Sequence, residues 1–95
     1  MTTILVVDDE VGALTLIGIM LERGGFEVLK ARDAYSALDM LNHASPDLII
    51  LDVMMPGMNG IDLCRRIRAM PENRHTPIVI LSARGDPASI EMGLA

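Results

Sequence analysis

The stretch that decides the fold is DLIILD at residues 47–52, followed by the turn-forming segment MMPGMNG at residues 54–60. An uninterrupted aliphatic run of this length is typical of a strand buried on both faces of a parallel sheet. Asp52 ends the run, and a carboxylate at that position needs a cation, hydrogen-bond donors or a chemical role. Ligands also bind at this end of the strands in open parallel sheets. Asp52 is therefore the first candidate for a functional residue.

The composition limits the range of possible proteins. The 95 residues provide for one small domain, and 51% of them are hydrophobic but only 2% aromatic, which predicts an aliphatic core. No apolar run reaches the roughly 18 residues of a membrane-spanning helix, and no signal peptide is visible. With Cys64 as its single cysteine, the chain is expected in the cytoplasm. The net charge of −5 argues against a direct nucleic-acid-binding module.

Apolar runs and turn signals alternate along the rest of the chain. Strands are predicted at residues 3–8, 26–31, 47–52 and 77–82. Helices are predicted at residues 11–23, 34–42 and 60–70, with a fourth opening at Asp86–Pro87. This β-α order predicts an α/β fold with a doubly wound parallel sheet, right-handed crossovers and helices on both faces.

Local signals mark the ends of these helices. The Gly24–Gly25 pair is suited to end the first helix, and Asp33 can cap the second. Asp62 and Arg66 are spaced to form an i,i+4 ion pair on the outer side of the third helix.

Polar side chains follow three of the predicted strands. Asp8 and Asp9 follow the first, Asp52 ends the third, and Ser82 ends the fourth. Because the carboxyl ends of parallel strands lie on one rim, these side chains are expected to face one pocket. Clustered carboxylates repel unless a cation joins them, and oxygen ligands favour a hard cation such as Mg²⁺. A carboxylate beside Mg²⁺ can act as a nucleophile towards phosphorus.

Each of these residues also has a simpler interpretation when taken alone. Asp8 and Asp9 could cap the following helix, Asp52 could be a turn residue, and Ser82 could be a turn or cap residue. Their order and their positions at strand ends favour the functional interpretation for the acidic residues.

Taken together, the motifs resemble the receiver domain of two-component response regulators. The resemblance rests on ILVVDDE at residues 4–10, on LIILD and MPGMNG at residues 48–52 and 55–60, and on PIVILSA at residues 77–83. It implies a flavodoxin-like sheet with strand order 2-1-3-4. It also implies a cytoplasmic signalling switch that works with a histidine kinase or phosphotransfer protein, rather than a metabolic enzyme.

The resemblance also assigns roles to residues. Asp52 would be the phosphoacceptor, and Asp8 and Asp9, chiefly Asp9, would bind Mg²⁺ with it. The backbone carbonyl of Met54 would be a further metal ligand, and Ser82 would be the switch hydroxyl.

The resemblance is incomplete at the C-terminus. The fifth strand and last helix of the family are expected to be absent from residues 1–95, so that the fourth strand forms an edge. The family's lysine and aromatic switch residue lie on that absent strand. Lys30 is the only lysine, and it ends the predicted second strand, where it cannot replace the missing one.

The first predicted helix suggests an alternative function. Residues 11–21 carry no charge, and a helix this apolar is usually buried on more than one side. It could pack under the absent helix, or it could join a second copy in a homodimer that also uses the exposed sheet edge. The alternative is then an interaction module that is not phosphorylated. A Mg²⁺-dependent phosphohydrolase is a third, weaker hypothesis, because Met54 stands where a second acid is expected.

Overall fold

The computed structural model describes residues 1–53, 55, 57–81 and 91–92. Its elements are β1 (Thr3–Val7), α1 (Val11–Arg23), β2 (Glu27–Ala31), α2 (Ala34–Leu41), β3 (Leu48–Asp52), α3 (Gly60–Arg68), the short 3-10 helix η1 (Pro71–Asn73), β4 (Ile78–Leu81) and β5 (Glu91–Met92). The first four strands and three helices agree with the predicted elements to within two residues at each end. η1 lies between the predicted helix at residues 60–70 and the predicted strand at residues 77–82, where no helix is predicted.

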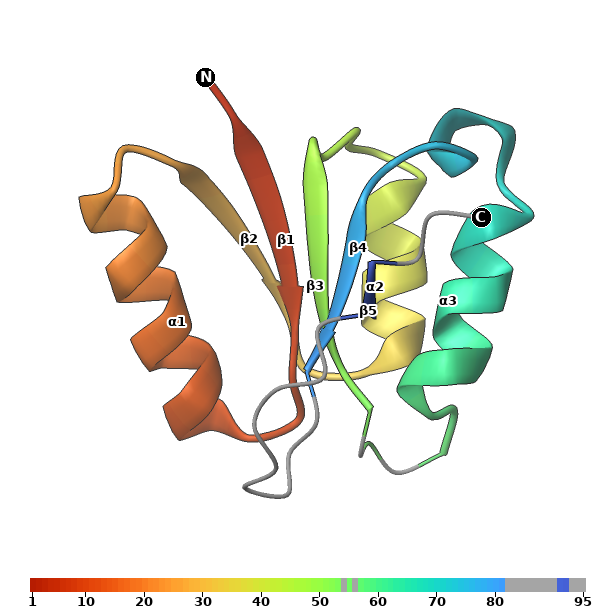
Figure 1. Ribbon diagram of the computed structural model, residues 1–95. Coiled ribbons are helices and arrows are strands. Elements are labelled where there is room, and N and C mark those ends of the chain that lie inside the picture. The colour runs from red at the N-terminus through yellow and green to blue at the C-terminus, as the bar shows by residue number, and fades with distance from the viewer. Residues whose placement is uncertain (54, 56, 82–90, 93–95) are drawn as a thin grey trace.

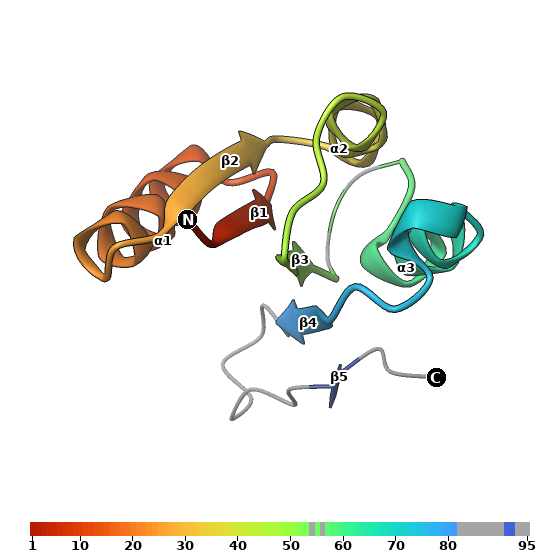
Figure 2. The ribbon, with the colours of Figure 1, turned by 90° about the horizontal axis from the view of Figure 1, so that it is seen from above.

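The sheet has the order β2-β1-β3-β4-β5, and its first four strands are parallel. The predicted α/β fold with strand order 2-1-3-4 is thus confirmed. Helix α1 covers one face of the sheet, and α2 and α3 cover the other (Figures 1 and 2). Two-sided coverage explains why the central strands read as continuous apolar runs rather than as alternating ones.

The far side of β4 differs from the prediction. Val79 pairs with Met92 and Ile80 pairs with Glu91, in antiparallel orientation. The expectation that β4 is a bare edge is therefore wrong for these two residues, and Glu91–Met92 is a strand rather than part of a helix. An edge strand offers unpaired backbone donors and acceptors, which any extended segment can satisfy. The predicted start of the fourth helix at Asp86–Pro87 lies outside the described residues.

The core on the α2–α3 face is shielded from solvent. Ile49 and Leu51 of β3 and Ile78 of β4 are fully buried there, against Leu63 and Ile67 of α3. Burying one such side chain stabilises the fold by about 1.5–3 kcal/mol. The carboxyl end of the sheet is thus held in place from this face.

The α1 face is covered less completely. Leu14 packs on Ile4 and Val6 of β1, but Leu48 and Ile50 of β3 are only half-buried on this side. Figure 2 shows α1 beside β2 and β1, and on this face of the sheet no helix of the described chain lies over β3 and β4. Part of the apolar sheet surface therefore remains open next to α1.

The helix ends largely follow the predicted signals. Gly24 is the C-cap of α1, and Gly25 adopts a φ of 92°, which favours glycine. Asp33 caps α2 by accepting a hydrogen bond from the Ser36 N–H at 2.7 Å. That bond holds the pKa of the Asp33 carboxyl below its ordinary value of 3.8. The cap therefore contributes stability above pH 3.8, and this is lost as the pH falls through the lowered pKa.

The prediction that Asp62 pairs with Arg66 on α3 is wrong. Asp62 lies 4.0 Å from Arg65, at i,i+3, and not beside Arg66. Both spacings place side chains on neighbouring positions of a helix, so tertiary surroundings decide between them. Arg66 instead faces the groove between α2 and α3.

Arg68 has a structural role that its position in a basic run does not reveal. Its Nη1 donates to the backbone carbonyls of Asn73 at 2.9 Å and Thr76 at 2.6 Å. Asn73 itself is buried in η1. These bonds hold the loop that returns the chain from α3 into β4.

Removal of the α3 cap tests how this helix begins. The Asn59 side-chain oxygen accepts from the Asp62 N–H at 2.9 Å. We expect Asn59→Ala to lower the free energy of unfolding by about 1 kcal/mol in urea titrations, because one N-terminal donor loses its partner. Asn59→Ser keeps an acceptor and should stay within a few tenths of a kcal/mol of the wild type. Equal stability of all three proteins would contradict this role of the cap.

Candidate functional site

The candidate site lies at the carboxyl edge of the sheet, where β1 and β3 end side by side. Val7 pairs with Leu51 in the parallel register, so Asp8 leaves β1 at the level at which Asp52 ends β3. Both strands are held at this level by buried side chains on each side of them. The register of two apolar strands, and not any local motif, brings the two carboxylates together.

Asp9 completes a cluster of three carboxylates. One carboxylate oxygen of each of Asp8, Asp9 and Asp52 lies within 4.8 Å of the others. Asp8 is 9% exposed and Asp52 is 7% exposed, whereas Asp9 is open to solvent. The predicted convergence of these three side chains is therefore what the structure shows.

Asp8 is oriented by hydrogen bonds on both sides. Its backbone N–H donates to the Ala31 carbonyl at the end of β2, and its side chain accepts from the Glu10 N–H at 3.0 Å. The N-cap of α1 is Glu10, which makes no side-chain cap bond. The interpretation of Asp8 and Asp9 as the N-cap residues of α1 is therefore wrong, although Asp8 does stabilise the turn that precedes the helix.

The chemistry of this cluster favours a hard cation. Two unit charges about 4 Å apart repel by about 1 kcal/mol in water and by several times more where solvent is partly excluded. A divalent cation bound between the carboxylates would turn that repulsion into attraction. All three donors are carboxylate oxygens, which suit Mg²⁺ or Ca²⁺ rather than a softer metal. The partly exposed position leaves room for water or a phosphoryl oxygen as further ligands.

Two of the predicted site residues, Met54 and Ser82, lie outside the described residues. Their described neighbours belong to the same rim of the sheet. The Val53 N–H donates to the Leu81 carbonyl at 3.2 Å, and Asp52 pairs with Leu81 across β3 and β4. The roles of Met54 and Ser82 stay predictions.

Basic side chains border one side of the cluster. Lys30 and Arg32 line a surface depression of about 630 Å³ together with Asp9. The stem of Lys30 lies over Gly18 of α1, so closely that a Cβ at position 18 would be 2.5 Å from its Cε. The side chain of Lys30 therefore packs against α1.

Gly60 is a site residue that the sequence analysis did not single out. Its N–H donates to the Val53 carbonyl at 3.1 Å, which folds the loop after β3 back onto the strand. A Cβ at this position would lie 2.7 Å from the Asp52 carbonyl oxygen and 2.9 Å from the Val53 Cα. Only the presence of a glycine at the start of a helix could have indicated this close approach.

None of the helices in the described part of the chain has both the length and the apolarity that crossing a membrane requires.

Comparison with known sequences identifies relatives over nearly the whole chain. The family model of the response regulator receiver domain matches residues 4–95. The DNA-binding response regulator MtrA of Mycolicibacterium paratuberculosis is 42% identical over 91 residues, which are 96% of this chain and 39% of the relative. The phosphate regulon transcriptional regulatory protein PhoB of Rhizobium meliloti is 45% identical over 92 residues, covering 97% and 40%. The chain thus spans about two fifths of the length of these relatives.

Solved structures agree with this result. The chemotaxis response regulator CheY4 of Vibrio cholerae superposes with a TM-score of 0.86 at 33% identity, over 92% of this chain and 72% of that one. The N-terminal domain of a response regulator receiver protein from Methanoculleus marisnigri gives a TM-score of 0.82 at 40% identity, covering 86% and 67%.

The contact at Gly60 can be tested by adding a single methyl group. We expect Gly60→Ala to destabilise the protein by about 1–3 kcal/mol in urea unfolding, because backbone atoms at Asp52 and Val53 must move. Gly12→Ala in α1 is the matched control, since its Cβ would meet nothing closer than 4.0 Å. The control should be neutral or stabilising, by up to about 1 kcal/mol. If both variants are equally stable, the close approach at Gly60 is not a constraint.

Proposed function

Because the chain belongs to the response regulator receiver domain family, we propose that it accepts a phosphoryl group on Asp52. The donor would be the phosphohistidine of a histidine kinase or phosphotransfer protein. One observation carries the proposal, namely the convergence of Asp8, Asp9 and Asp52 within 4.8 Å. Carboxylates gathered at the end of a parallel sheet repel one another, and a bound cation would offset that cost.

In this proposal Asp8, Asp9 and Asp52 hold Mg²⁺, with Met54 contributing its backbone carbonyl. The donor set fits the ion, because the three described side chains offer only carboxylate oxygens. When bound, the ion would neutralise negative charge on the transferring phosphoryl oxygens. The hydrogen bond from the Glu10 N–H would keep the Asp8 carboxylate turned towards the site.

The chemical step needs little from the protein beyond position and charge. A carboxylate oxygen of Asp52 forms a bond to phosphorus while the P–N bond of phosphohistidine breaks, and the imidazole that leaves takes a proton from solvent. The product is an acyl phosphate on Asp52. Asp52 is 7% exposed, so most of its side chain is shielded from solvent.

The result of phosphorylation would be a changed interaction surface. The receiver family consists of signalling domains. In this proposal the chain acts as a switch rather than as a metabolic enzyme. The hydroxyl of Ser82 would sense the phosphoryl group from the end of β4. The relatives MtrA and PhoB are described as a DNA-binding response regulator and a transcriptional regulatory protein. We propose that phosphorylation of Asp52 in this chain likewise acts by altering a surface that binds a partner.

Beryllofluoride with Mg²⁺ mimics the phosphoryl group and tests the proposal. We expect amide chemical shifts to change around residues 8, 9, 52 and 82 when both are added, and Mg²⁺ alone to shift a smaller set. Asp52→Asn should abolish the beryllofluoride response, because the acceptor oxygen is lost. Asp47→Asn, at the opposite end of the same strand, removes one carboxylate as well and should leave the response intact.

The readouts separate the metal from the acceptor. If Mg²⁺ shifts the cluster but beryllofluoride adds nothing, the site binds a cation without accepting a phosphoryl group. If Asp52→Asn and the wild type respond alike, Asp52 is not the acceptor. A phosphomonoester turnover assay would detect the phosphohydrolase, for which we expect no Asp52-dependent activity.

A second candidate function is supported by α1. Leu16 is 59% exposed and Met20 is 63% exposed, one turn apart on the helix, and Ile19 beside them is also exposed. These side chains lie on the side of α1 opposite the buried Leu14 and Gly18. A homodimer through this side of α1 would cover them, and the chain would then act as an interaction module. The open edge that was expected to contribute is partly taken by β5.

The oligomeric state distinguishes this second candidate. If α1 mediates a dimer, size-exclusion chromatography with light scattering should give twice the monomer mass at high micromolar concentration. The double variant Leu16→Glu/Met20→Glu should then be monomeric, because charges would be buried without partners. Glu22→Gln on the same helix should leave the mass unchanged. A monomeric wild type at that concentration excludes the dimer.

A further inference from the structure

The groove between α2 and α3 has a composition unlike that of the acidic rim. Two depressions lie along it, of about 380 Å³ and about 420 Å³, and Arg66 lines both of them. The chain as a whole carries a net charge of −5, so a positive side chain shared by both depressions distinguishes this groove from the acidic rim. The phosphoacceptor proposal gives this groove no role.

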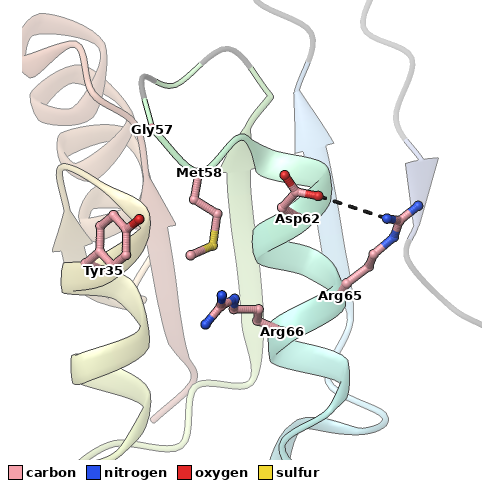
Figure 3. A pocket seen from close by; sticks show the side chains of 6 residues that line it. All are labelled: Tyr35, Gly57, Met58, Asp62, Arg65 and Arg66. Carbon is pink, nitrogen blue, oxygen red and sulfur yellow. Dashed lines mark ion pairs between the residues drawn. The ribbon is translucent and has the colours of Figure 1, made fainter.

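The depression nearer the carboxyl edge is framed by both helices. Figure 3 shows Tyr35 of α2 and Arg66 of α3 facing it from opposite sides, with Met58 between them. Met58 is buried, and it forms an apolar floor for the depression. Arg65 points away along the outside of α3 and is paired with Asp62 at 4.0 Å (Figure 3).

The second depression is mainly apolar. Leu38 of α2 and Met70 after α3 are half-buried against the core, and each leaves part of its side chain in the groove. Ala69 and Asn42 complete the lining. Methionine side chains adapt their shape to different ligands, so a surface with Met58 at one end and Met70 at the other suits a variable apolar partner.

Arg66 is the one arginine of α3 without an internal task. Arg65 pairs with Asp62, and Arg68 donates to loop carbonyls. Within residues 1–53, 55, 57–81 and 91–92, the exposed guanidinium of Arg66 has no ion pair or hydrogen bond. A guanidinium offers paired donors that match a carboxylate. Arg66 lies between a depression with Met58 as its apolar floor and a second, mainly apolar one, so it favours a ligand with a carboxylate flanked by apolar groups.

From this arrangement we propose that the α2–α3 groove binds a short peptide segment of a partner protein. The segment carries one acidic side chain on Arg66, flanked by apolar side chains that enter the two depressions. Apolar burial supplies affinity, and the carboxylate–guanidinium pair fixes the register. Two separate depressions with a charge between them suit a peptide better than a compact small molecule, which binds in one enclosed cavity.

The electrostatics favour a ligand with one acidic residue over a highly acidic one. The net charge of −5 repels a polyanion at long range, and Asp62 lies on the same depression as Arg66. The attraction to Arg66 acts at hydrogen-bond distance. A ligand with a single carboxylate at that position therefore gains the ion pair with Arg66 and is repelled little by the negative charge of the chain.

A library of random peptides provides the probe. Peptides about 12 residues long would span roughly 18 Å as a helix, which exceeds the length of the 8-residue α2. They would be displayed on phage and selected on the immobilised chain. We expect enriched sequences to share one Asp or Glu between apolar residues, and labelled copies to bind with shifts confined to α2, α3 and Met58 in NMR spectra. Arg66→Ala should weaken their binding about tenfold or more, the usual effect of losing a charge-assisted pair.

Charge reversal makes the test independent of stability. Arg66→Glu should lose the acidic peptide and bind the same peptide with Lys in place of its acidic residue. Arg23→Ala, which removes one positive charge from α1 on the other face of the sheet, should bind like the wild type. The proposal is overturned if no peptide is enriched, if the enriched peptides bind Arg66→Ala as tightly as the wild type, or if their shifts map elsewhere.

Discussion

The parallel pairing of β1 with β3 is the constraint on which the rest of this structure depends. It aligns Val7 with Leu51, so that Asp8 and Asp52 emerge at one level and Asp9 can join them. A shift of one residue in this register would turn the apolar side chains of a strand to the opposite face and separate the carboxylates. The hydrophobic core thereby stabilises a charge cluster that would be unfavourable by itself.

The helices cover the two faces of the sheet to different degrees, and this difference affects which partners each face could bind. On the α2–α3 face, Ile49, Leu51 and Ile78 are fully buried, and the groove around Arg66 is open to solvent. On the α1 face, half-buried residues of β3 lie beside the half-buried Ile17 and Leu21 of the helix, and its outer side exposes further apolar side chains. The first surface is a groove with a defined charge, whereas the second is a broad apolar area. They would recognise different kinds of partner for that reason.

The loop after β3 connects the acidic rim to the groove. It begins at Asp52, folds back through the bond from Gly60 to Val53, and places Met58 under the groove. The close approach of Gly60 to the Asp52 carbonyl joins the start of α3 to the end of β3. Asp52 lies on the acidic rim on one side of this contact, and Met58 lines the groove on the other.

The sequence by itself determined the element order, the parallel order of the first four strands and the candidate acidic residues, because apolar runs, helix caps and strand-end carboxylates are local signals. Only the tertiary structure decided the rest. Three side-chain arrangements depend on what surrounds α3. Asp62 pairs with Arg65, Arg68 donates to loop carbonyls, and Arg66 pairs with none of the residues that the structure describes. The pairing of Glu91–Met92 with β4 likewise depends on an edge that exists only once the sheet has formed. Local patterns set which elements form, but side-chain partners and edge pairing are chosen by contacts between residues distant in the chain.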